Sequence, residues 1–458
     1  MTTMTTKRTV ATLRPLVALV AAAALFGCVM KDDEETARAP APPQGVEQGT
    51  EPVASGAPIT GHMTEDEAWL ERERLDPAWR TAADSDRQAR HSRAAGRGAA
   101  TAPPPEQAGG SDAPVVRMRA RVTQEGTGAA ADGGEPSPSP SAAGAAESWE
   151  AISPDAFADF SPTLPVPQEG GGPTVLALQW MLDRVSFSPG VIDGRWGKNS
   201  EKAVYWLQDS LGLEPTGRAD RRLWDLLSGQ VGVDGPLREH TVTSSDLEGP
   251  FLAIPEDVYA QAELDCLCYS SPAEALAERF HTTPELLARL NPDVDLASVA
   301  AGQRLWVPAV EEVAAERGIA DDVAEIVVSK GGFYLHALDE AGDVLYHFPT
   351  TVGASYQPSP EGELTVTGIA YRPTYHYQPT ELSTVPDDEE EAMLPAGPNS
   401  PVGLVWVNLS EDGYGIHGTS APATIGYATS HGCVRLTNWD AVFLANRTAQ
   451  GTTVRFTG

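Results

Sequence analysis

A long stretch of the chain lacks the hydrophobic pattern that a folded domain needs. From Lys31 to about Pro165 the sequence consists of alanine, proline, glycine, serine and charged residues with no sustained period. Such a composition cannot bury enough apolar surface to offset the entropy of ordering the backbone. We therefore expect residues 29–165 to form a disordered tether and the folded mass to lie in the C-terminal two-thirds. A flexible segment of roughly 130 residues has a root-mean-square reach on the order of 60 Å.

The N-terminus has the features of an export signal. Basic residues precede an apolar run, Leu16 to Phe26, that is too short to cross a bilayer comfortably. The run ends in Gly27-Cys28, and a small residue directly before a cysteine resembles the bacterial lipobox. The resemblance implies a signal peptide over residues 1–28, acylation of Cys28 and a membrane-anchored lipoprotein of the periplasm or cell envelope. Val29 after the cysteine favours the outer membrane; ordinary signal cleavage is the alternative.

Charge and cysteine content narrow the possible partners. The formal net charge is -32, and such a polyanion excludes nucleic acid as a ligand because phosphate binding needs clustered lysine and arginine. Two of the four cysteines, Cys266 and Cys268, are separated by one residue. They could form a mutual disulfide or remain free buried thiols. No histidine or cysteine nearby completes a metal site.

Three short helices are predicted between residues 166 and 235. Leu178, Leu182 and Val185 fall on one face of the first helix. Ser200 is predicted to cap the second helix, and the stretch Gly217 to Asp220 opens the third. Together they indicate a compact all-helical unit.

The second helix and the loop before it resemble a known family. The stretch Val191 to Ser200, followed by Ala203-Val204 and Leu207-Gln208, resembles the peptidoglycan-binding domain type 1 family. Serine and leucine stand at Ser200 and Leu207 where that family has threonine and phenylalanine. The resemblance implies that residues 166–235 bind the cell wall; a helical spacer without a ligand is the alternative.

Residues 236–310 are predicted to form a second small unit. Ser271 to Glu274 is a capping box, and Thr283-Pro284 opens a second helix that Asn291-Pro292 ends. The stretch Gly302 to Pro308 follows as a turn and a short strand. This order, with its Gly-Gln-x-Leu-x-Val-Pro ending, resembles the second half of a LysM module and implies binding of glycan chains. The module's first strand is not recognisable, so a domain that only positions its neighbour is the alternative.

From about Ala324 the hydrophobic period changes to two, which predicts a β-rich domain built from hairpins over residues 320–458. The stretch Tyr371 to Pro398 is long, proline-rich and irregular, and it contains an acidic run. A segment of that length in a compact domain favours a functional loop or lid. A solvated excursion is the alternative.

One stretch carries the residues for nucleophilic catalysis. His417-Gly418-Thr419 is followed by Ser430 to Arg435, a stretch that includes His431, Gly432 and Cys433. Cysteine attacks as a thiolate, and a neighbouring imidazole can take its proton, so we expect a thiolate at a pH well below the ordinary thiol pKa. Glycine before the cysteine permits a turn in which backbone N–H groups converge, as an oxyanion requires. An arginine offers a bidentate fork to a carboxylate.

These residues resemble the signature of L,D-transpeptidases with a YkuD-type catalytic domain, over roughly residues 320–458. The resemblance implies that Cys433 is the nucleophile, that His417 is the general base and that the carbonyl of Gly418 orients it. The N–H groups of His431, Gly432 and Cys433 would form the oxyanion hole. The remaining residues assigned to substrate binding are Arg435, Ser430 and Thr419.

The implied reaction is acyl transfer in peptidoglycan. The thiolate attacks the peptide bond before a terminal D-alanine, a thioester forms, and an amine of a neighbouring stem peptide resolves it. No metal or organic cofactor is required. The alternatives are an L,D-carboxypeptidase on the same site, a non-catalytic wall-binding lipoprotein, a buried structural cysteine, and a zinc site of Cys433 with both histidines.

The expected architecture is therefore multidomain. A mainly-β, YkuD-like β-sandwich catalytic domain follows a small three-helix domain and a small LysM-like α/β domain. The partners implied are peptidoglycan stem peptides, glycan strands and, through the N-terminal lipid, a membrane.

Overall fold

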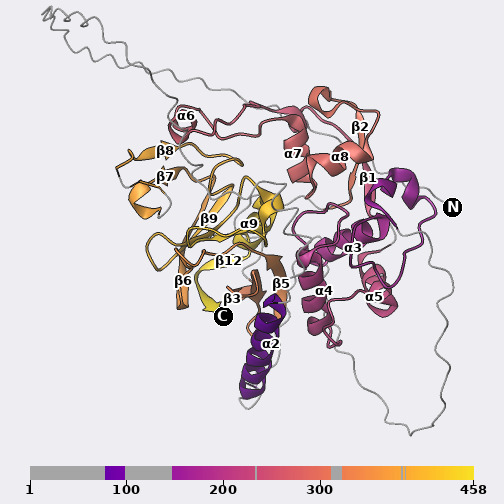
Figure 1. Ribbon diagram of the computed structural model, residues 1–458, viewed down its shortest axis with the longest axis horizontal. Coiled ribbons are helices and arrows are strands. Elements are labelled where there is room, and N and C mark those ends of the chain that lie inside the picture. The colour runs from indigo at the N-terminus through magenta and orange to yellow at the C-terminus, as the bar shows by residue number, and fades with distance from the viewer. Residues whose placement is uncertain (1–77, 98–146, 233–234, 311–321, 383–384, 387) are drawn as a thin grey trace, which may run out of the picture. The chain divides into compact units, whose positions relative to one another are not determined.

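The computed structural model describes residues 78–97, 147–232, 235–310, 322–382, 385–386 and 388–458 (Figure 1). All of them belong to Gly56–Gly458, one of two compact units of the chain. The predicted signal peptide and Cys28 lie outside the described residues. Within these ranges, none of the helices is both long and apolar enough to cross a membrane.

The predicted three-helix unit consists of α3 (Pro173–Arg184), α4 (Lys198–Ser210) and α5 (Arg221–Val231). Asp220 caps α5 as predicted, because its carboxylate accepts a hydrogen bond from the Leu223 N–H at 2.9 Å. Ser200 does not cap α4, which begins after Gly197. The prediction was wrong because the Ser200 hydroxyl accepts a hydrogen bond from Gln179 Nε2, at 3.3 Å, inside a buried polar network.

The next unit is built around a two-stranded sheet. Strand β1 (Leu237–Thr241) pairs antiparallel with β2 (Arg304–Pro308), and α7 (Pro272–Arg279) and α8 (Pro284–Leu290) lie between them in sequence. Strand β1 is the one that the sequence did not reveal, since its burial does not alternate regularly. An insertion before α7 contains α6 (Val258–Ala262) and a disulfide between Cys266 and Cys268.

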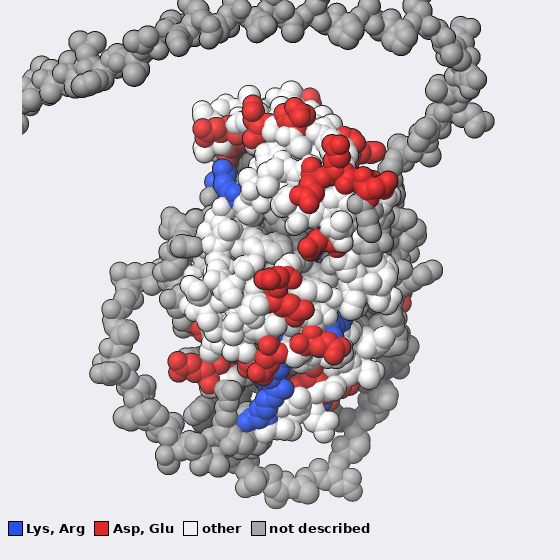
Figure 2. All heavy atoms as spheres, turned by 90° about the vertical axis from the view of Figure 1, so that its left-hand side faces the viewer, with Lys and Arg blue, Asp and Glu red and all other residues white. Residues whose placement is uncertain are grey.

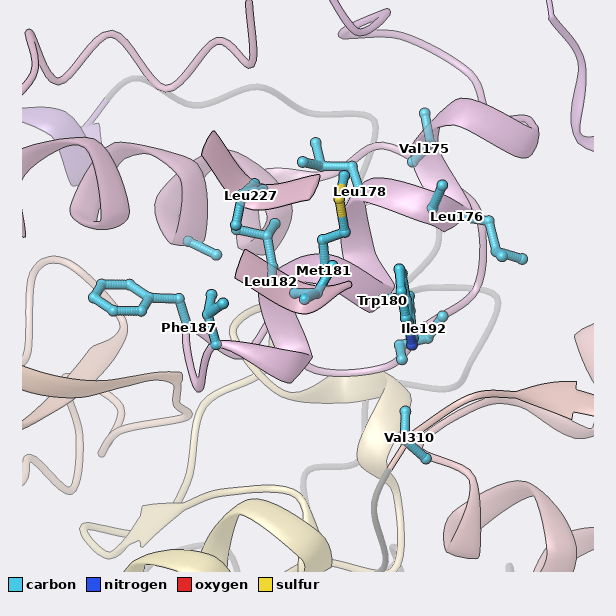
Figure 3. Close-up of a cluster of buried hydrophobic side chains, with 14 of the residues drawn as sticks. Val175, Leu176, Leu178, Trp180, Met181, Leu182, Phe187, Ile192, Leu227 and Val310 are labelled. Carbon is cyan, nitrogen blue, oxygen red and sulfur yellow. The ribbon is translucent and has the colours of Figure 1, made fainter. Parts of the chain in front are cut away.

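These two units share one hydrophobic core. Figure 3 shows Leu178, Leu182 and Leu227 from the helices, with Trp180 directed toward the Val310 side of the cluster. The Trp180 indole N–H donates to Ala309 O at 3.0 Å. The units that the sequence separates at residue 235 are therefore packed as one body.

The C-terminal region is a mainly-β domain. Hydrogen bonds join eight strands in the order β11-β10-β9-β6-β12-β3-β4-β5. Their bounds are β3 (Val323–Ser329), β4 (Tyr334–Leu338), β5 (Val344–Pro349), β6 (Gly362–Tyr371), β9 (Val405–Leu409), β10 (Gly415–His417), β11 (Val434–Arg435) and β12 (Thr448–Thr457). Helix α9 (Asn438–Ala445) connects β11 to β12, and a separate pair, β7 (Tyr375–Tyr377) and β8 (Ala392–Leu394), lies in the predicted lid.

The predicted β-sandwich is not made of two separate sheets. Strand β6 pairs with β12 through Gly362–Thr365 and with β9 through Val366–Tyr371, with a bulge in the second ladder. A bulge bends a strand and increases its local twist, so one strand can serve two halves of a sheet. Buried side chains of both halves belong to one hydrophobic cluster, which α9 completes.

Part of the predicted tether is ordered, which corrects the sequence interpretation. Helix α2 (Ala78–Arg97) and two 3-10 turns, η1 (Trp149–Ala151) and η2 (Pro154–Phe157), fall within residues 29–165. Trp79 and Ala83 are buried, and the carboxylate of Asp86 accepts a hydrogen bond from the Tyr334 hydroxyl at 2.7 Å. A helix that is held by so few apolar residues gives no detectable period in the sequence.

Candidate active site

A cleft in the C-terminal domain brings the predicted catalytic side chains together. Cys433, His417, His431 and Arg435 all line it. Part of the lid segment, including Tyr375 and the turn η5 (Pro379–Glu381), lines it as well. The cleft has a volume of about 360 Å³, within the roughly 300–1,000 Å³ of a typical small-molecule pocket.

Cys433 follows a tight turn that only glycine allows. Gly432 has a φ of +109°, and a Cβ there would lie 2.8 Å from Tyr414 Cε1. The Ser359 hydroxyl donates to the Gly432 carbonyl at 2.7 Å and holds the turn from outside. The Cys433 thiol is partly exposed to the cleft and donates to the Gly413 carbonyl at 3.5 Å.

His417 is a neutral base with a defined tautomer. It ends β10, is buried, and stacks on Trp406 with ring centroids 5.3 Å apart. Its Nδ1 lies 2.7 Å from the Gly418 carbonyl, which can only accept, so Nδ1 carries the proton. Burial lowers the pKa of His417 to about 3, and the Arg435 charge contributes to the shift. Nε2 is therefore the unprotonated, basic nitrogen at neutral pH.

The resting thiol is protonated as well. Burial raises the pKa of Cys433, and the carboxylate of Glu381 adds to this effect, whereas a backbone hydrogen bond and the Arg435 charge oppose it. The sequence led us to expect a thiolate well below the ordinary thiol pKa. The structure gives the opposite direction, because desolvation outweighs the nearby positive charge and the thiol's hydrogen bond goes to Gly413 rather than to His417.

Arg435 lies beside the catalytic pair on β11, where it is the register partner of His417 on β10. The position is fixed by the backbone, since Thr351 exchanges hydrogen bonds with Arg435 at 2.9 and 3.0 Å. Its Nε is buried and has no hydrogen-bond partner. A guanidinium N–H left in this state is an unused donor within the cleft.

Comparison with known proteins agrees with this geometry. The L,D-transpeptidase catalytic domain model, YkuD, matches residues 324–455, and a model described as "Putative peptidoglycan binding domain" matches residues 171–227. The "Putative L,D-transpeptidase YkuD" of Bacillus licheniformis is 31% identical over 185 residues, which are 40% of this chain and 92% of the relative. The chain belongs to the L,D-transpeptidase family. The protein of the same name from Bacillus subtilis is 29% identical over 39% of this chain and 90% of its own length.

Solved L,D-transpeptidase structures also match. One from Xylanimonas cellulosilytica is 15% identical, covers 65% of this chain and all of its own, and has a TM-score of 0.29. At this TM-score the two structures do not superpose closely enough to equate individual residues of this transpeptidase with those of the solved structure.

The rear of the transpeptidase site contains residues that the sequence did not reveal. A Cβ on either Gly403 or Gly418 would lie 2.0 Å from Asn438 Oδ1, so the first residue of α9 packs directly against the turn that follows His417. Asn438 Oδ1 accepts a hydrogen bond from the Leu404 N–H at 3.0 Å, and its Nδ2 donates to the Pro398 carbonyl at 3.2 Å.

This rear contact extends into the helical part of the transpeptidase. Asn438 Nδ2 also lies 3.1 Å from both carboxylate oxygens of Glu278 on α7, and the Tyr269 hydroxyl donates to Glu278 Oε1 at 2.8 Å. Burial raises the pKa of Glu278 to about 7. No local sequence signal could have found these residues, because they join segments 160 positions apart.

Ser430 and Thr419, the other residues predicted to bind substrate, make local hydrogen bonds, and Ser430 also lines the cleft. The Ser430 hydroxyl is buried and donates to the Cys433 carbonyl at 2.5 Å, while it accepts from the Gly432 N–H at 3.3 Å. Thr419 is buried, is not part of the cleft lining, and accepts a hydrogen bond from the Ala421 N–H at 3.2 Å. Small hydroxyl side chains next to turns favour such local bonds, and a part of these two residues in substrate binding stays a prediction.

His431 also lines the cleft. It is half-buried, and its ring meets the edge of Tyr356 at a centroid distance of 6.3 Å. Burial and the Arg435 charge lower its pKa. Its side chain therefore forms part of the cleft wall.

The front of the site comes from the lid and from the loop before β10. Tyr375, Glu381, Gly413 and Tyr414 all line the cleft. Burial raises the pKa of Tyr375 to about 12, so its hydroxyl is a neutral donor at physiological pH. The sequence indicated the lid but could not single out these residues, since nothing in it shows which side of the lid faces the cysteine.

Proposed function

We propose that Cys433 is the nucleophile of peptidoglycan L,D-transpeptidation and that His417 is its general base. The observation that carries this assignment is the Nδ1 contact of His417 with the Gly418 carbonyl, which leaves Nε2 as a proton acceptor in the cleft that Cys433 lines. Because both groups are neutral at rest, proton transfer accompanies the attack of sulfur.

The first half-reaction forms a thioester. The Cys433 sulfur attacks the carbonyl before the terminal D-alanine while its proton moves to His417 Nε2. The C–N bond then breaks, and the nitrogen of D-alanine takes that proton and leaves as an amine. The side chain of Arg435, with its unpartnered Nε, would bind a carboxylate of the donor peptide.

The second half-reaction consumes the thioester. A neutral amine of a second stem peptide attacks the thioester carbonyl, a C–N bond forms, and the C–S bond breaks. One amine proton passes through His417 to the departing sulfur, which restores the thiol. If water attacks in place of the amine, the product is a shortened peptide and the enzyme acts as an L,D-carboxypeptidase.

The oxyanion of each step would be stabilised in the His431-Gly432-Cys433 turn. The Gly432 N–H already donates to Ser430, so we assign the main part to the Cys433 N–H. Donors that are fixed before the reaction stabilise developing charge without reorganisation.

The helical units would hold the enzyme on its substrate. The match of residues 171–227 to a peptidoglycan-binding model supports peptidoglycan as the partner. The β1-α7-α8-β2 arrangement over residues 236–310 supports a LysM-like unit that contacts glycan chains. Lipidation of Cys28 would keep the enzyme in the cell envelope, at the outer membrane where one exists. These three assignments are separable from the catalytic one.

The catalytic assignment is tested with purified muropeptides and mass spectrometry. With a tetrapeptide donor we expect an adduct on Cys433 equal to the donor minus D-alanine, and a cross-linked product when an amine acceptor is added. Cys433→Ala should give neither. An adduct on another residue, or cross-linking by Cys433→Ala, would overturn the assignment, and an adduct that yields only hydrolysed peptide would identify a carboxypeptidase.

A further inference from the structure

We propose that Glu381 receives the ammonium group of the acceptor substrate and thereby makes the enzyme selective for cationic amine acceptors. This inference rests on the proposed transpeptidation and deepens it, because it assigns the second substrate to one wall of the cleft. Glu381 ends the turn η5 in the lid and lines the cleft together with Cys433.

The position of Glu381 is fixed from both sides. The Gln357 side-chain amide donates to the Glu381 carbonyl at 2.7 Å. Its neighbours Pro379 and Leu382 are buried, so the turn is anchored while the side chain of Glu381 remains exposed. The backbone thus holds a solvent-accessible carboxylate at the rim of the cleft.

The carboxylate faces the loop that contacts the nucleophile. A Cβ on Gly413 would lie 3.2 Å from Glu381 Oε2, and the Gly413 carbonyl is the group that accepts the Cys433 thiol hydrogen bond. Glu381 and Cys433 therefore both lie next to Gly413. Its charge raises the pKa of Cys433, and also those of Tyr375 and Tyr414, although burial is the larger cause in each.

Two opposite charges act on the thiol from different elements. Arg435 comes from β11 and lowers the pKa of Cys433, whereas Glu381 comes from the lid and raises it. A donor carboxylate on Arg435 and an acceptor ammonium on Glu381 would bind to different elements of the cleft that Cys433 lines. Acyl transfer between two stem peptides requires two such separate binding positions near one sulfur.

The acidity of this side of the molecule agrees with a cationic acceptor. Figure 2 shows the side of the molecule on which β7 and β8 lie in Figure 1, with Asp and Glu side chains scattered over it and few Lys or Arg side chains among them. Such a surface attracts cations and repels anions. A hydrated carboxylate binds an ammonium weakly, and it stabilises the charged form rather than the attacking neutral amine. We therefore expect Glu381 to lower the acceptor KM without raising kcat.

The test compares acceptors of different charge on variants of the full chain. The thioester is formed first and is then resolved by a peptide with a diamino side chain, by uncharged hydroxylamine, or by water. For E381Q we expect the KM of the diamino peptide to rise about two- to fivefold, the upper part of the range of an exposed ion pair. Acylation, hydrolysis and hydroxylaminolysis should change less than about twofold, and E381D should recover part of the loss.

Glu411→Gln is the matched control. It removes the same charge from the loop before β10, where Glu411 acts on Tyr414 but is neither among the charges acting on Cys433 nor part of the cleft lining. Equal KM changes in E381Q and E411Q, or equal losses for charged and uncharged acceptors, would overturn the proposal. Failure of the wild-type enzyme to form a thioester would instead refute the proposed function, so the two outcomes are distinguishable.

Discussion

The rear and the front of the active site are built in different ways. At the rear, Asn438 is buried and makes hydrogen bonds to Leu404, Pro398 and Glu278 behind the turn that orients His417. At the front, Glu381 is exposed and its backbone is held by one side-chain amide, that of Gln357. We propose that the difference reflects two roles: the rear would hold the base in place, and the front would select the acceptor substrate.

The largest effect should follow from removing the base at the rear. His417→Ala should lower kcat/KM for thioester formation by about 10²- to 10⁴-fold, because proton transfer by a positioned base contributes that much. Alkylation of Cys433 in the resting enzyme should change little, since the lowered pKa of His417 leaves the imidazole neutral and without influence on the thiolate fraction.

The pH profile of alkylation provides the check. In the wild type the rate should rise only at alkaline pH, because burial raises the pKa of Cys433 above its usual range. If the alkylation rate of the wild type instead rose with a midpoint near or below pH 7, and His417→Ala abolished this midpoint, the resting enzyme would contain a thiolate–imidazolium pair. That result would contradict the assignment of a neutral thiol and a neutral imidazole. If His431→Ala were the variant that silences turnover while His417→Ala remained active, the base would be misassigned.

An intermediate effect should follow from loosening the rear. Asn438→Ala removes the donor to Pro398 and Glu278 and the acceptor of the Leu404 N–H. Leaving buried groups unpaired costs about 1–3 kcal/mol each, so we expect the free energy of unfolding to fall by roughly 2–4 kcal/mol. The turn behind His417 should also loosen, lowering kcat by about tenfold while KM values stay close to those of the wild type. Chemical denaturation and steady-state kinetics measure both quantities, and a change in KM alone would remove the distinction between rear and front.

The smallest effect should come from Glu278, and it should depend on pH. Burial raises the pKa of this carboxyl from 4.5 to about 7 in the folded protein, so the folded state binds its proton more tightly than the unfolded state does. The free energy of unfolding should therefore fall as the pH rises from 4.5 to about 7, and then level off. Glu278→Gln should remove on the order of 1–3 kcal/mol of this decline.

Two features make the Glu278 experiment decisive. The raised pKa of Asp440 produces a decline of its own in the same direction, so part of the slope should persist in Glu278→Gln. Glu285→Gln removes the same charge from an exposed side chain on α8 and serves as the control. Equal slopes in the wild type and both variants would mean that Glu278 is already ionised at acid pH.

The sequence was most informative where function depends on residues close together in the chain. The order of residues in the turn from Ser430 to Arg435, with the histidine of β10, predicted the family, which the comparisons confirm. The helices α3, α7 and α8 followed from apolar spacing and caps. Contacts across the chain could not be predicted in this way: Asn438 with Glu278, or Glu381 with Gly413, depend on packing of the whole unit. The same is true of α2, whose attachment through Asp86 to Tyr334 has no periodic signature.

The contact of α4 with the loop between His417 and Cys433 extends the part of the chain that the active site needs. Asn199 Nδ2 donates to the Ile425 carbonyl at 2.8 Å, and a Cβ on Gly426 would lie 2.2 Å from Asn199 Oδ1. Both loop residues lie between His417 and Cys433 in the sequence. Helix α4, which belongs to the segment that matches a peptidoglycan-binding model, therefore packs against the active-site loop and supports its conformation. A protein trimmed to the homologous stretch 324–455 would retain every reacting atom and lose the surface against which their loop is shaped. The stretch that matches the catalytic-domain model is thus shorter than the part of the chain that packs together, and activity should be measured on a protein that includes α4.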